Sequence, residues 1–121
     1  MYSFFIVMMA SHTQQISSPT QVNDLLSGYG NQIIGILKKF FGDKPVEIYL
    51  YGSRARKNAN FGSDIDLMVR YPEKAKPGLS GIREAFYESH IPYKVDLVGW
   101  NEAADELKRN VENEGILLWK N

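Results

Sequence analysis

The chain has no cysteine among its 121 residues. Disulfide bonds, zinc sites built on thiolates and a cysteine nucleophile are therefore all excluded. It also has no excess of charge of either sign, because 14 Lys and Arg balance 14 Asp and Glu. Sequence-independent binding to nucleic acid needs surplus cations that displace counterions, so no direct nucleic-acid partner is expected. The absence of cysteine fits a reducing compartment, and a cytoplasmic protein is expected.

A long hydrophobic run is missing as well. The apolar stretch at residues 2–10 is far shorter than the ~20 residues that span a bilayer, and no positive charge precedes it as in a signal peptide. Three interpretations stay open for this stretch: an edge strand or packing arm, an extension upstream of a start at Met8 or Met9, and a signal peptide. The expected domain comprises residues 20–121, and residues 1–19 form an N-terminal arm or linker. No contact with a membrane is expected.

What the chain does contain is a succession of helix and strand patterns. Over residues 20–41, apolar side chains recur every three or four positions, which predicts one amphipathic helix. Ser18 or Thr20 is suited to begin this helix, and Gly42 is suited to end it.

Strand and helix patterns then alternate along the rest of the chain. Three strands are predicted, at residues 45–52, 64–71 and 93–100. Two more helices are predicted at residues 79–90 and 102–114, the second capped by Asn101. The sequence therefore predicts a single α/β domain whose sheet has three or more strands.

Acidic residues recur at special places in the predicted strands. Asp64 and Asp66 lie two positions apart, so both side chains leave the same face of their strand. Asp96 lies in the third predicted strand and would join them if that strand is the neighbour of the second. Three carboxylates on one surface repel one another unless a cation offsets their charge, and oxygen ligands suit Mg²⁺ or Mn²⁺.

A turn with phosphate-binding character precedes the aspartates. Gly52 and Ser53 end the first predicted strand and begin one or two helical turns, where free backbone N–H groups and a hydroxyl can bind an anion. Arg54 and Arg56 follow at once. Because residues two apart on a helix point different ways, we expect one arginine to bind phosphate and the other to face solvent or a partner.

Taken together, the stretch "GSRARKNANFGSDIDL" and the later "VDLV" are recognisable. Gly-Ser, ten intervening residues and Asp-x-Asp resemble the motif of nucleotidyltransferases of the DNA polymerase beta superfamily. The chain is most similar to the minimal nucleotidyltransferases paired with HEPN-domain proteins in toxin–antitoxin operons, and the resemblance covers residues 28–118. It implies a mixed sheet flanked by helices.

The resemblance also implies roles for the motif residues. Gly52 and Ser53 would bind the phosphates of ATP, Asp64 and Asp66 would bind a divalent metal, and Asp96 would be the third carboxylate. In the implied reaction a nucleoside monophosphate passes to an acceptor hydroxyl and pyrophosphate leaves. Asp96 is then either the general base or a ligand of a second metal ion.

The size of the chain bears on the acceptor. One small domain leaves little room for a second substrate-binding unit, so another protein is expected to present the acceptor. By resemblance this partner is a HEPN-type toxin, modified with AMP on a tyrosine, and the chain is its antitoxin. Two alternatives remain open: an antitoxin that neutralises its partner by binding alone, and a nucleotidyltransferase that acts on a small molecule or an RNA end.

Overall fold

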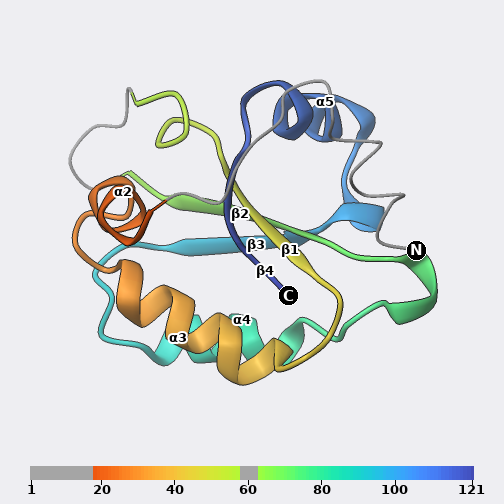
Figure 1. The fold of residues 1–121 in the computed structure, drawn as a ribbon, viewed down its shortest axis with the longest axis horizontal. Coiled ribbons are helices and arrows are strands. Elements are labelled where there is room, and N and C mark those ends of the chain that lie inside the picture. The colour runs from red at the N-terminus through yellow and green to blue at the C-terminus, as the bar shows by residue number, and fades with distance from the viewer. Residues whose placement is uncertain (1–17, 58–62) are drawn as a thin grey trace.

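A computed structural model describes residues 18–57 and 63–121. A four-stranded sheet lies at its centre, with α3 and α4 on one side and α5 on the other (Figure 1). The N-terminal arm expected at residues 1–19 lies almost wholly outside the described residues. None of the helices within the described ranges is long and apolar enough to cross a membrane.

The sheet has the strand order β3-β2-β1-β4. Its strands are β1 (Glu47–Tyr51), β2 (Ile65–Arg70), β3 (Val95–Gly99) and β4 (Ile116–Lys120). The three predicted strands are thus confirmed, and the C-terminal segment adds a fourth. β1 pairs antiparallel with both β2 and β4, whereas β2 and β3 run parallel. The sheet is therefore mixed, as the resemblance implied.

The single helix expected over residues 20–41 is wrong, because two helices occupy this stretch: α2 (Pro19–Leu25) and α3 (Gly30–Phe41). Ser27 and Gly28 between them have φ values of 55° and 88°, which no helix continues through. The predicted ends are confirmed: Ser18 caps α2 in a capping box, and Gly42 follows α3.

The predicted cap of the last helix is also wrong. Residues Trp100–Glu102, including Asn101, form a short 3₁₀ turn, and α5 (Asp105–Glu114) begins after it, with Ala104 at the cap position. The buried Trp100 explains the delay, because its ring packs against the sheet and the chain must turn before a helix can start. α4 (Ser80–Glu88) forms within the predicted range.

The apolar side chains form two clusters, one on each face of the sheet. The larger lies under α2, α3 and α4 and includes Leu37, Leu50, Leu67, Ile82 and Leu97. The smaller lies under α5 and includes Tyr49, Met68, Trp100, Val111 and Leu117. On the α5 face, the C-terminal end of β1 and the N-terminal ends of β2 and β3 carry a row of half-buried residues, Tyr51, Asp66 and Asp96. That partly open end of the sheet holds the sequence motif.

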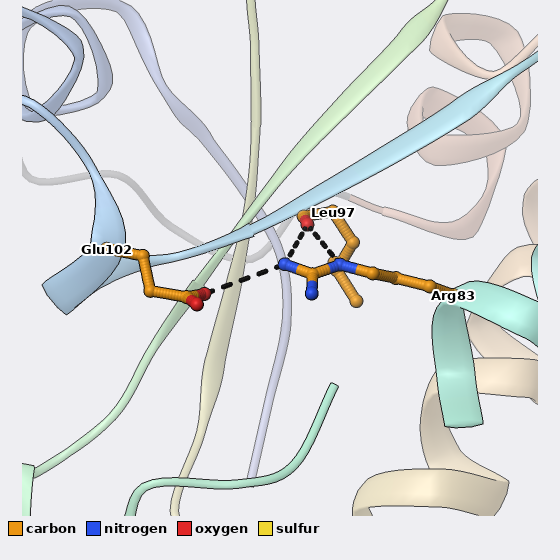
Figure 2. Close-up of polar contacts among 3 residues, drawn as sticks. All are labelled: Arg83, Leu97 and Glu102. Carbon is orange, nitrogen blue, oxygen red and sulfur yellow. Dashed lines mark hydrogen bonds and ion pairs between the residues drawn. The ribbon is translucent and has the colours of Figure 1, made fainter. Parts of the chain in front are cut away.

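The outer edge of β3 is covered by a side chain. Arg83 of α4 donates from Nε and Nη2 to the carbonyl oxygen of Leu97, at 3.0 and 2.9 Å (Figure 2). Glu102 lies 3.5 Å from the same guanidinium. An unpaired edge carbonyl is a template for pairing with another strand. Arg83 therefore blocks strand addition at this position.

We predict that Arg83→Met lowers the free energy of unfolding by about 1–2 kcal/mol, because the Leu97 carbonyl loses two charge-assisted hydrogen bonds. Glu102→Gln is the matched control: it removes only a half-exposed ion pair and should cost less than about 0.5 kcal/mol. Urea denaturation of both variants measures the difference. Equal losses would contradict a role for the carbonyl bonds.

Candidate active site

Three polar side chains form a row across the end of the sheet. In the strand register Tyr51 of β1 pairs with Asp66 of β2, and Asp66 pairs with Asp96 of β3. Side chains of directly paired residues leave the same face of a sheet. The expectation that the third strand lies beside the second, and brings Asp96 to Asp66, is therefore confirmed.

The electrostatics of this row centre on Asp66. Burial raises the pKa of the Asp66 carboxyl, and the charges of Asp96 and Asp64 raise it further. Burial, together with Asp66 and Asp96, also raises the pKa of Tyr51 to about 12. The Tyr51 hydroxyl is thus protonated at neutral pH and is available as a hydrogen-bond donor. The row is negatively charged and favours a cation.

Two cations partly offset this charge. Lys94 Nζ lies 3.5 Å from Asp96 Oδ1, although the Lys94 side chain is 70% exposed. The charges of Arg54 and Lys94 both lower the pKa of Asp66, but less than burial and the carboxylates raise it. An exposed lysine pair is weak, so the excess of negative charge persists.

Asp64 precedes β2 and its side chain is exposed. Within the described residues no group of three or more His, Cys, Asp or Glu side chains is gathered tightly enough to hold a metal ion. Asp64 lies outside β2, so the strand register places only Asp66 and Asp96 side by side. The donor set itself consists of carboxylate oxygens, which suit Mg²⁺ or Mn²⁺.

Gly52 brings the backbone close to the carboxylates. Its φ is 77°, a conformation that favours glycine. A Cβ at this position would lie 2.5 Å from Asp66 Oδ2. The following residues form a single turn, in which the Arg56 N–H donates to the Gly52 carbonyl at 3.2 Å. Gly52 therefore lies directly beside Asp66, and phosphate binding by Gly52 and Ser53 stays a prediction.

The structure gives Arg54 a different place from the one expected. Its side chain is 5% exposed, and Nη1 donates to the Leu25 carbonyl and to Ser27 Oγ. Nε and Nη2 donate to the Ser63 carbonyl, and Nε also reaches that of Asp64. With its donors directed at these oxygens, Arg54 holds the turn and the start of β2 in place. The arrangement argues against a phosphate contact.

Arg56 is turned away from the carboxylates. Its Nη1 lies 3.1 Å from Glu114 Oε2 of α5, and both side chains are about half-exposed. Arg56 thus lies at the surface, and the expectation that one of the two arginines binds phosphate stays a prediction. An exposed pair of this kind can open at little cost.

Sequence reasoning missed Tyr51 and Lys94. Tyr51 stands directly before the Gly-Ser turn and Lys94 directly before the third strand, so both signals were present. Their significance depends on the strand register, which brings them beside Asp66 and Asp96. An isolated sequence does not specify that register.

Comparison with known proteins finds a curated relative that is similar in sequence. A Haemophilus influenzae protein named "Probable protein adenylyltransferase MntA" is 26% identical over 72 residues, 59% of this chain and 63% of that protein. This chain thus spans less than two thirds of that curated relative.

Solved structures of toxin–antitoxin proteins also resemble this chain. One is a toxin–antitoxin crystal structure with AMP-PNP: 28% identity, a TM-score of 0.58, and 75% of this chain aligned with 73% of the other. Another is a tri-AMPylated Shewanella oneidensis HEPN toxin in complex with MNT antitoxin: 30% identity, a TM-score of 0.55, and 75% aligned with 69%.

The family comparison covers most of the domain. The model described as "Polymerase beta, Nucleotidyltransferase" matches residues 31–121. This range includes the Gly-Ser turn, the Asp-x-Asp strand and the strand with Asp96. The chain therefore belongs to the polymerase beta nucleotidyltransferase family.

Proposed function

We propose that this chain is a metal-dependent protein adenylyltransferase. It transfers AMP from ATP to a tyrosine hydroxyl of a HEPN-type toxin in the cytoplasm, and so acts as that toxin's antitoxin. The observation that carries the proposal is the pairing of Asp66 with Asp96 directly beside the close-approach glycine, Gly52. The relatives support the choice of nucleotide and partner, because their names include AMP-PNP, an AMPylated HEPN toxin and a protein adenylyltransferase.

In this proposal the Gly-Ser turn binds the triphosphate. Gly52 has a positive φ and no side chain, so nothing lies between its backbone and Asp66, and a phosphate can approach both. The Ser53 hydroxyl can donate to a phosphate oxygen. Arg54 acts indirectly by fixing the turn, and Arg56 is free to exchange its exposed pair with Glu114 for a ligand.

The residues present suit a divalent cation. Asp64, Asp66 and Asp96 would hold Mg²⁺ or Mn²⁺, which when bound neutralises the charge of the triphosphate and of the departing pyrophosphate. The support is the surplus of negative charge on the row, where burial and two neighbouring carboxylates raise the pKa of Asp66. Hard oxygen donors fit these ions rather than softer metals.

The transfer itself requires that the reactants be positioned and that the charge of the transition state be stabilised; it does not require a protein nucleophile. The acceptor oxygen bonds to the α-phosphorus while the bond from that phosphorus to the bridging oxygen breaks. Pyrophosphate leaves with those electrons, and a carboxylate takes the phenolic proton. Asp96 is suited to this last step because it lies on the outermost strand, on the side of Asp66 away from Gly52.

We predict that Asp66→Asn and Asp96→Asn each reduce AMP transfer by at least about 100-fold, since each removes charge from the reacting site. The assay uses α-labelled ATP, Mg²⁺ and the HEPN-domain protein encoded beside this chain. Asp43→Asn, at an exposed position outside the site, is the control and should transfer like the wild type. Absence of label with the wild type, in a complex that still silences the toxin, would instead favour neutralisation by binding alone.

We predict that in EDTA Asp66→Asn is more stable than the wild type by about 1 kcal/mol, because one of three repelling carboxylates is gone. Adding Mg²⁺ should raise the thermal midpoint of the wild type and leave the variant nearly unchanged. Thermal denaturation under both conditions provides the measurement. A variant that is less stable than the wild type in EDTA would contradict net repulsion among Asp64, Asp66 and Asp96.

We predict that Gly52→Ala weakens AMP-PNP binding at least about tenfold, because the added methyl would meet Asp66 Oδ2 and strain a positive φ. Gly35→Ala is the matched control: it lies within α3, and a Cβ there meets nothing within 4 Å. That control should bind normally and gain slight stability. Calorimetric titration compares the two, and equal affinities would contradict the phosphate role of Gly52.

A further inference from the structure

A cavity of about 590 Å³ lies along the free edge of β3. Asp96 and Tyr51, from the row at the end of the sheet, line one part of it. The end of α4 and the connection to β3 line the rest, with Tyr87, Pro92 and Tyr93 among them. In the strand order β3 is outermost and the Gly-Ser turn follows β1, two strands away, while Tyr51 at the end of β1 also lines the cavity. A group in the cavity would reach Asp96 from the free edge of β3.

We propose that this cavity receives the acceptor, the phenol ring of a tyrosine with an acidic residue beside it on an exposed segment of the partner protein. The inference rests on the proposed adenylyl transfer and adds the route by which the hydroxyl arrives. In-line displacement requires the acceptor and the leaving group on opposite sides of the α-phosphorus. The proposal meets this requirement by placing the acceptor at the free edge of β3 and the triphosphate at the turn that follows β1.

The walls favour an aromatic acceptor. Apolar and aromatic side chains line one part of the cavity, including Phe86, Tyr87, Ile91 and Tyr93, and the Asp96 carboxylate and the Tyr51 phenol line another. A phenol ring has the same division into an apolar body and a polar tip. A nucleic-acid end would bring several phosphates, for which the lining offers two cations, Arg83 and Lys94.

The charges of the lining favour an acidic neighbour. The lining contains two cations, Arg83 and Lys94, and one carboxylate, Asp96. Lys94 is well exposed and lies 3.5 Å from Asp96, and the half-exposed Arg83, which also donates to the Leu97 carbonyl, lies 3.5 Å from Glu102. A carboxylate on the incoming segment therefore finds complementary charge near the mouth of the cavity.

The edge of β3 decides how the segment enters. The Leu97 carbonyl, which an added strand would need, already accepts two hydrogen bonds from Arg83 (Figure 2). Strand addition is thus blocked at the middle of β3. The acceptor segment presents a side chain to the cavity and does not extend the sheet.

Site-specific cross-linking tests this placement without relying on catalysis. The chain has no cysteine, so Tyr87→Cys provides a single attachment point for benzophenone maleimide at the rim of the cavity. Tyr87 is 89% exposed, and its replacement should cost little stability. The labelled chain is mixed with the HEPN-domain protein, irradiated, and the cross-linked peptide is identified by mass spectrometry.

The expected product joins Tyr87→Cys to a partner peptide that holds a tyrosine next to an Asp or Glu, and that tyrosine is the one labelled by α-labelled ATP. Phe40→Cys is the control, since Phe40 is a 40% exposed aromatic residue of α3 outside the cavity, and it should not capture this peptide. Cross-links from Tyr87→Cys to other segments only, or the same peptide from both variants, would overturn the proposal.

A second readout separates this proposal from the function on which it rests. Tyr87→Ser should lower kcat/KM for AMP transfer to the HEPN-domain protein about tenfold and leave the binding of AMP-PNP unchanged. An unchanged kcat/KM for the protein acceptor would overturn the proposed cavity while adenylyl transfer stands. A wild-type chain that transfers no AMP would overturn the function, and the cross-linked peptide would still decide where the partner binds.

Discussion

The buried guanidinium of Arg54 joins the segments on which the site depends. It donates to the Leu25 carbonyl and Ser27 Oγ after α2, and to the Ser63 and Asp64 carbonyls before β2. It also lies 4.7 Å from the centre of the Tyr93 ring, just before β3. A planar cation with several fixed donors can satisfy these carbonyls together, which a lysine cannot. Arg54 therefore fixes the backbone at Ser63 and Asp64.

The carboxylate row shows a conflict between stability and chemistry. Asp66 is half-buried between charges of its own sign, and burial is the largest cause of its raised pKa. Lys94 and Arg54 reduce the repulsion without removing it. Apolar packing elsewhere offsets the cost, with Leu50, Leu67 and Leu97 buried on the opposite face of the same strands. Among the described residues, the charge of Asp66 and Asp96 is offset only in part.

The sequence predicts the parts of this molecule that follow from local patterns. Alternating apolar residues located β1, β2 and β3, and the spacing of Gly52, Asp64 and Asp66 identified the motif. Long-range packing decided the rest. The break at Ser27 and Gly28 requires positive φ values, which the local sequence permits but does not predict. Arg54 was expected to be a possible phosphate ligand because its carbonyl partners, up to 29 positions away, cannot be identified from the local sequence. The delayed start of α5 similarly depends on where Trp100 packs.

The parallel pairing of β2 with β3 ties the site to the hydrogen-bond register of the sheet. Because side chains alternate, a slip of one residue would turn Asp96 to the other face and bring Leu97 out of the core. A chain folded in that way would lose its packing and its paired carboxylates in the same event. A misfolded chain with this slip is therefore expected to have no residual activity. In a preparation that contains both forms, the catalytic rate would be proportional to the fraction of native protein.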